Sequence, residues 1–196
     1  LQQLGPTFVK FGQMVSSRAE ALPVEWQVEF AKLQSDVPPF PGDVAIAIVE
    51  AELGKPLKEL YATFEHEPFA AASTAQVHRA TLFDGTPVVV KVQRPNIVPK
   101  IRADLSILEE VINTVASRNE WIRDNDIPGI FAEFARNLQD ELDYRIESFN
   151  ARRLADDMAV FPEVTVPRMY GHLTTAKVLT MDLVKGVKIV KVQEIA

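Results

Sequence analysis

Seven residues decide the fold of this chain: Pro87-Val88-Val89-Val90-Lys91-Val92-Gln93. Valine at this density favours a β-strand, because its branched side chain packs well on a pleated surface. The preceding residues 76–82 alternate in character, and Asp84-Gly85 between the two stretches is a strong turn signal. The sequence therefore predicts a β-hairpin over 76–93, with the even-numbered valines on one face and Lys91 on the other.

Helices are predicted on both sides of this hairpin. Before it, helical patterns start at Gly5-Pro6 and at Pro23, and a third from about Asp43 ends at Gly54, a residue suited to a left-handed cap. After it, helices are expected over 99–118 and 128–158. The second has apolar residues every three or four positions, which predicts one buried stripe: Phe131, Phe134, Leu138, Leu142, Ile146 and Phe149. Two short strands, near 164–170 and 176–181, complete the order.

The composition excludes several classes of protein. The chain of 196 residues has 21 Lys and Arg against 27 Asp and Glu, a formal net charge of −6. This charge argues against a nucleic-acid binder, whose affinity rests on neutralising phosphates. The chain has no cysteine, and its three histidines lack the spacing of metal ligands, so no metal site is predicted. No apolar run approaches the ~18–20 residues that a membrane helix needs.

Lys91 is the first residue with a chemical implication. A lysine among valines on a strand is costly to bury unless its ammonium group meets an anion. Three acids further along the chain can supply one: Glu141, Asp143 and Glu147. On one continuous helix Glu141 lies about 120° around from Glu147, so Lys91 should meet only one acid and leave another free. The alternative is a lysine on an edge strand and a solvated acidic helix face.

Two further segments suit a phosphate or a close backbone approach. Ala70-Ala71-Ala72-Ser73 precedes the hairpin, where nucleotide-binding lobes place a loop whose N–H groups cover phosphates. Such a run is also typical of simple helix packing. Lys10-Phe11-Gly12-Gln13 puts a glycine inside a predicted helix, at a cost of about 1 kcal/mol relative to alanine. The alternative there is a surface lysine and glutamine on an amphipathic helix.

Taken together, these motifs resemble the UbiB-type atypical protein-kinase-like family, also called the aarF-domain or ABC1-type kinases. The resemblance runs through essentially the whole chain, with its motifs in the right order and spacing. It rests on these segments: Lys10-Phe11-Gly12-Gln13, Ser16-Ser17-Arg18, Lys32-Leu33-Gln34, Ala70-Ala71-Ala72-Ser73, Gln76-Val77-His78, Val90-Lys91-Val92-Gln93-Arg94-Pro95 and Glu141-Leu142-Asp143-Tyr144.

The resemblance implies an α+β fold. Residues 63–196 would form a protein-kinase-like small lobe, with an antiparallel sheet and a long αC-type helix. Residues 1–62 would form a helical extension in front of it, and the large lobe would be absent.

The resemblance also assigns roles to residues. Lys91 would hold the α- and β-phosphates of ATP or ADP, with Glu147 favoured over Glu141 as its partner, and Glu141 and Asp143 would lie near the nucleotide. Met181 resembles the gatekeeper that precedes the hinge. The remaining nucleotide contacts would come from the extension, the alanine-rich loop, the first hairpin strand and the hinge: Lys10, Gln13, Ala70, Ala71, Ala72, Ser73, Gln76, Asp182, Leu183 and Val184.

Phosphoryl transfer further needs a catalytic-loop Asp, an Asn and a Mg²⁺-binding Asp. The sequence lacks these motifs, so Mg²⁺ is expected only together with the large lobe. We expect a segment of a longer atypical kinase or ATPase that supports isoprenoid quinone (ubiquinone-type) or lipid metabolism, and we expect the segment alone to be inactive. The rival interpretations are a pseudo-kinase scaffold that binds nucleotide without turnover and a helical interaction module.

The expected partners are a nucleotide and, for the full-length protein, a lipid-like small molecule or quinone-biosynthesis proteins. Nucleic acid is not expected. The expected location is the cytoplasmic or organelle-matrix side, with peripheral membrane association in the full-length protein and no secretion.

Overall fold

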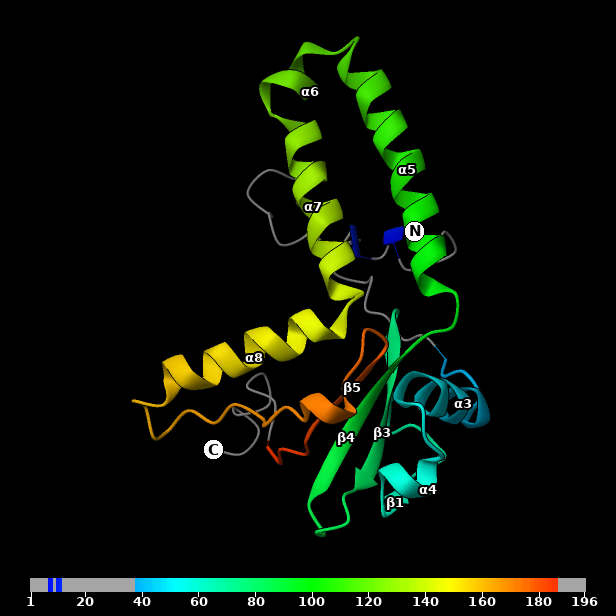
Figure 1. Ribbon diagram of the computed structural model, residues 1–196. Coiled ribbons are helices and arrows are strands. Elements are labelled where there is room, and N and C mark those ends of the chain that lie inside the picture. Colours follow the sequence, from blue (N-terminus) through cyan, green and yellow to red (C-terminus); the bar gives the residue numbers. More distant parts are fainter. Residues whose placement is uncertain (1–6, 9, 12–37, 187–196) are drawn as a thin grey trace, which may run out of the picture.

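An antiparallel sheet lies at the centre of the structure, a computed structural model that describes residues 7–8, 10–11 and 38–186 (Figure 1). Its strands are β1 (Thr63–Phe64), β2 (Ala70–Ala71), β3 (Ala75–Thr81), β4 (Pro87–Gln93) and β5 (Val178–Asp182). The strand order is β1-β3-β4-β5, and β2 also pairs with β3. The β3–β4 pair confirms the predicted hairpin, and the mixed α+β class is confirmed with it.

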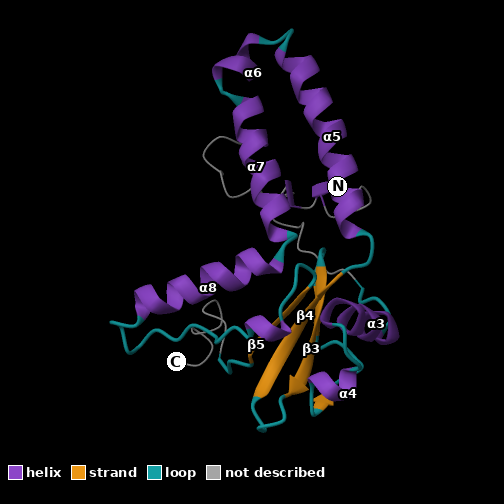
Figure 2. Ribbon diagram, viewed as in Figure 1, coloured by secondary structure: helices purple, strands orange, loops and turns teal. Residues whose placement is uncertain are grey.

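The helices fall into three groups around this sheet (Figure 2). The first group is α3 (Gly42–Leu53) with the single turn α4 (Leu57–Leu60). The second is a helical hairpin that stands away from the sheet, built from α5 (Ile97–Ala116), α6 (Glu120–Asp124) and α7 (Ile127–Glu141). The third is α8 (Tyr144–Met158), which packs against β5, as does the short 3₁₀ turn η3 (Gly171–Leu173).

The predicted third helix is confirmed as α3. Gly54 follows it in the left-handed region at φ 69°, and its N–H donates to the carbonyl oxygen of Glu50 at 2.8 Å. Glycine adopts this conformation without steric cost, so it ends the helix. The helices predicted from Gly5 and Pro23 fall largely outside the described residues.

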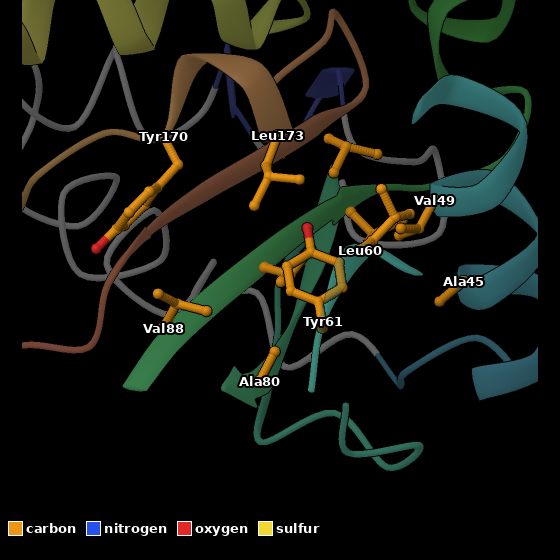
Figure 3. Close-up of a cluster of buried hydrophobic side chains, with 11 residues drawn as sticks. Ala45, Val49, Leu60, Tyr61, Ala80, Val88, Tyr170 and Leu173 are labelled. Carbon is orange, nitrogen blue, oxygen red and sulfur yellow. The ribbon is translucent and has the colours of Figure 1, made fainter. Parts of the chain in front are cut away.

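One face of β4 is sealed. Val88, Val90 and Val92 have no exposed surface and pack against α3, α4 and η3. Figure 3 shows this cluster, in which the labelled residues come from helices, strands and loops: Ala45, Val49, Leu60, Tyr61, Ala80, Val88, Tyr170 and Leu173. Because α3 and α4 share this core with the sheet, the boundary expected at residue 62 does not separate two cores; as a domain boundary it stays a prediction.

The prediction of one continuous helix over 128–158 is wrong in one respect: the helix is interrupted, and the chain forms α7 and α8 instead. Asp143 leaves the helical conformation (φ −122°, ψ 100°), and its carboxylate accepts from the Arg145 N–H as the N-cap of α8. Long-range contacts hold the break: the Gln93 amide donates to the Leu142 carbonyl at 2.8 Å, and the Tyr144 N–H donates to the Ala176 carbonyl at 3.1 Å.

The break also divides the predicted apolar stripe. Its first four members are buried between α5 and α7, whereas Ile146 and Phe149 on α8 are 37% and 66% exposed.

Of the two strands predicted after α8, only the second forms, as β5. Residues 164–170 contribute a single bridge between Met169 and Met181. Pro167, inside this stretch, lacks the N–H that a regular strand ladder requires, which accounts for the irregular path.

Candidate functional site

The second face of β4 carries an ion pair. Lys91 Nζ lies 2.8 Å from Glu147 Oε2 on α8. Lys91 stands opposite Val77 on β3 and Leu179 on β5, so it projects from the middle of the sheet. The two side chains are 23% and 38% exposed. The pair is therefore half open to solvent, and we expect its loss to cost less stability than the loss of a fully buried pair.

Tyr144 forms the floor beneath this pair. Its side chain is 1% exposed, and Lys91 Nζ lies 4.7 Å from the centre of its ring. Burial, with Glu147 and Glu141 nearby, raises the pKa of the Tyr144 phenol well above its usual range. Within the described residues its hydroxyl has no hydrogen-bond partner. Tyr144 was not among the predicted site residues, although its position three residues before Glu147 puts both on one helix face.

The other two acids are not free, contrary to expectation. Glu141, the last residue of α7, pairs with Lys10 Nζ at 2.6 Å. Asp143 pairs with Arg145 at 2.5 Å, and these hydrogen bonds lower the pKa of the Asp143 carboxyl. The expectation failed because the helix breaks between these acids and turns them toward different cations.

The part of the extension that carries Lys10 is seated on the helical hairpin. The Thr7 hydroxyl donates to Asp104 Oδ2 on α5 at 2.6 Å. The Phe11 ring packs edge-on against Phe131 and Phe134 of α7, with centroid distances of 6.4 and 5.4 Å. The hairpin thus holds Lys10 at the end of α7, beside the helix break. Gln13 lies outside the described residues.

The alanine-rich segment is partly a strand. Ala70 pairs with Val77 and so shares the face of Lys91, whereas Ala71 pairs with Gln76 and shares the opposite face. A tight turn follows, in which the Ala72 N–H donates to the Ala75 carbonyl at 2.8 Å. Ser73, inside this turn, is 4% exposed.

The structure places Gln76 away from Lys91. Gln76 stands opposite Val92, on the sealed face of the sheet, and has no exposed surface. Its amide accepts from the Phe40 N–H and donates to His78 Nε2, both at 2.9 Å. The expected nucleotide contact is therefore not available to this side chain, which instead anchors residues 38–40 to the sheet.

The expected gatekeeper and hinge lie at the end of β5 and directly after it. Met181 stands opposite Val89, on the face of Lys91. The Asp182 carboxylate accepts from the Tyr170 hydroxyl at 2.8 Å, and the Leu183 N–H donates to the Pro87 carbonyl at 3.1 Å. These bonds fix the strand end in place. Val184 is 51% exposed, and within the described residues its N–H makes no hydrogen bond.

The arrangement is a largely apolar sheet face with the Lys91 ammonium group near its centre. Val77, Val89 and Met181 share this face with Lys91, as does Arg79 opposite Val89, and the alanine-rich turn borders it. Apolar side chains suit a flat aromatic ring, and a half-exposed ammonium group held by a carboxylate suits phosphate oxygens. The described part of the chain contains no cluster of three or more His, Asp or Glu that could hold a metal ion.

The comparison with known families identifies the class of protein. Residues 32–196 match the ABC1 atypical kinase-like domain, and the chain belongs to this family.

Curated relatives are 39–44% identical to the chain. "Protein ACTIVITY OF BC1 COMPLEX KINASE 7, chloroplastic" from Arabidopsis thaliana is 44% identical over 187 residues, 95% of this chain and 27% of that protein. "Probable protein kinase UbiB" from Pseudomonas paraeruginosa is 39% identical over 192 residues, 96% of this chain and 36% of that protein. The chain therefore spans only about a third of the length of the relatives it matches.

A solved structure shares the fold. The Mycobacterium tuberculosis protein Rv3197, in its complex with erythromycin, superposes with a TM-score of 0.70 at 28% identity. The match covers 93% of this chain and 46% of that protein. Among the described helices, none combines the length and apolar character that a bilayer crossing requires.

Proposed function

We propose that this chain forms the nucleotide-binding half of an atypical kinase-like ATPase or phosphotransferase. The Lys91–Glu147 pair at 2.8 Å carries the proposal. In protein kinases a lysine on a strand of the small lobe, paired with a glutamate on an adjacent helix, positions the nucleotide phosphates. Here the same two residue types come from the central strand β4 and from α8, the helix that packs against the neighbouring strand β5.

Two observations support a nucleotide on this face rather than the opposite one. Ala70 and Met181 share the face of Lys91 by strand register. The other face is filled by the core around α3 and leaves no room for a ligand. We place the adenine against the apolar residues beside Met181 and the phosphates at Lys91, next to the alanine-rich turn.

The proposed substrate class follows from family membership. Relatives include proteins named as kinases, one a probable protein kinase UbiB and another a chloroplastic BC1 complex kinase. For the full-length protein we propose ATP hydrolysis, or phosphorylation of a lipid-like small molecule, in isoprenoid quinone or lipid metabolism. Mg²⁺ and the acid that orients the attacking group would come from the part of the protein beyond these residues.

The test is a titration of the full-length protein with ATP, with melting temperature and calorimetric binding as readouts. We expect Glu147→Gln to weaken ATP binding about tenfold or more, because Lys91 loses the carboxylate that orients it. Glu52→Gln is the matched control, since it removes the partner of Lys177 at 2.7 Å, an ion pair away from Lys91. Equal ATP affinity in all three proteins would refute the proposed site. ATP binding without any turnover would favour the pseudo-kinase scaffold.

A further inference from the structure

Arg94 donates hydrogen bonds to backbone carbonyls in two different segments of the chain. It directly follows β4, three residues after Lys91. Its Nε donates to the Ala72 carbonyl at 2.9 Å and its Nη2 donates to the Pro38 carbonyl at 2.8 Å. Its own N–H donates to the Thr74 carbonyl at 2.9 Å. One residue thus contacts both the alanine-rich turn and the segment that leads in from the extension.

The segment from Pro38 to Phe40 is fixed at a second point. The Phe40 N–H donates to the buried Gln76 amide, and the Phe40 ring lies 5.7 Å from the Arg94 guanidinium carbon. This segment is therefore bound to β3 through Gln76 and to the end of β4 through Arg94. A displacement of the segment would have to break bonds to both central strands.

A lysine could not replace Arg94 here. Two carbonyls in different segments are met by two nitrogens of one rigid planar fork, whereas a lysine offers a single flexible ammonium group. Burial lowers the pKa of Arg94, which shows that the guanidinium gives up part of its hydration to occupy this position.

The bond to Ala72 has a consequence for the turn. A peptide unit is planar and trans, so fixing the Ala72 carbonyl also fixes the direction of the Ser73 N–H. Within the described residues no hydrogen bond occupies this N–H. Backbone N–H groups in such turns are the usual contacts to phosphate oxygens.

We infer that Arg94 is a positioning residue: it orients the Ser73 N–H for a nucleotide phosphate and couples the alanine-rich turn to residues 38–40. The phosphate role rests on the proposed function. The coupling does not, because it joins parts of the nucleotide-free protein.

Hydrogen–deuterium exchange of the nucleotide-free, full-length protein tests the coupling. Arg94→Ala is expected to speed exchange about tenfold in 70–77 and at Phe40 and Gly42, the two residues of 38–42 that carry an amide hydrogen, because each segment loses a bond to the same side chain. Arg94→Lys keeps the positive charge but loses the planar guanidinium, and it is expected to speed exchange in both segments as well. This result would show that the geometry of the side chain matters and not its charge alone. Arg102→Ala, which removes an exposed arginine of α5, is the control. Wild-type exchange in either segment, or uniform acceleration across the whole chain, would overturn the coupling.

Paired titrations with ATP and adenosine test the phosphate role. Arg94→Lys is expected to weaken ATP binding about tenfold while adenosine binding stays within twofold of wild type, because only the phosphate contact is misplaced. Equal losses for both ligands, or none, would refute this role. If wild type binds neither ligand, the proposed function fails and the phosphate role with it, and the exchange data alone decide the coupling.

Discussion

The two faces of β4 differ in how deeply they are buried and in the side chains that they carry. Val90, on the face toward α3, has no exposed surface and belongs to the hydrophobic core on that side. Lys91, its neighbour in the chain, projects from the other face, 23% exposed and paired with Glu147. One strand therefore supplies stability on one side and a candidate binding group on the other. The contrast predicts that substitutions one residue apart separate folding from ligand binding.

The largest effect is expected on the sealed face. Val90→Lys places a charge where no partner or water can reach it, and should destabilise the fold by more than about 4 kcal/mol. Loss of the cooperative unfolding transition in circular dichroism would show this. A variant that unfolds with wild-type cooperativity and midpoint would mean that this face is less closed than the structure shows.

The next effect is a much smaller change in stability, expected on the open face that carries Lys91. Lys91→Met keeps a similar volume and breaks a half-exposed pair, so the free energy of unfolding in urea should change by about 1 kcal/mol or less. Lys177→Met, which breaks the pair with Glu52, is the control for losing a lysine. A destabilisation as large as that of Val90→Lys would show that Lys91 belongs to the core and would remove the contrast between the faces.

A smaller effect depends on pH and again concerns the sealed face. His78 is fully buried; its Nδ1 lies 2.9 Å from the Glu65 carbonyl, and its Nε2 accepts from the Gln76 amide. Burial lowers the pKa of His78 below the usual histidine value of about 6.5. Below about pH 6.5 the unfolded chain takes up a proton that the folded protein resists, so stability falls as the pH drops.

Urea unfolding at pH 7.5 and pH 5.5 measures this dependence. Wild type should lose more stability between the two values than His78→Gln. His66 acts in the opposite sense, because Asp43 and Glu67 raise its pKa, but it is common to both proteins. Equal losses in wild type and His78→Gln would contradict a neutral buried His78.

The smallest effect is predicted for Tyr144→Phe. The hydroxyl has no partner among the described residues, so its removal should leave stability unchanged or raise it by about 1 kcal/mol. The ring that faces Lys91 remains, and nucleotide affinity should stay at the wild-type value. Differential scanning calorimetry and the ATP titration measure the two quantities. A clear loss of stability would reveal a partner for the hydroxyl in the rest of the protein.

Much of the fold could be predicted because its signals are local. The Val-rich strand, the turn at Asp84-Gly85 and the cap at Gly54 each depend on a few consecutive residues. The helix break at Asp143 could not be predicted in this way, because it depends on the Gln93 amide and the Ala176 carbonyl, both distant in sequence. An aspartate suited to an N-cap was the one local signal.

The face of Gln76 illustrates a second limit. A two-residue turn at Asp84-Gly85 would pair Gln76 with Gln93 and place it beside Lys91. The structure instead closes the turn between Leu82 and Thr86, with Gly85 at φ 85°, so Gln76 stands opposite Val92. Because side chains alternate along a strand, this shift of one residue moves Gln76 to the other face. The type of turn therefore decides which face of the sheet Gln76 occupies, and composition alone does not specify the type of turn.

The helix break has a consequence for how the chain tolerates changes in length. Glu141 ends α7 and Asp143 caps α8. The number of residues between these two acids therefore sets how the two helices are joined. One residue inserted between Asp143 and Glu147 would rotate Glu147 by about 100° around α8 and carry it away from Lys91. An insertion at residues 117–119, at the far tip of the helical hairpin, would leave both acids in place. Insertions and deletions are therefore expected at that tip rather than between Asp143 and Glu147.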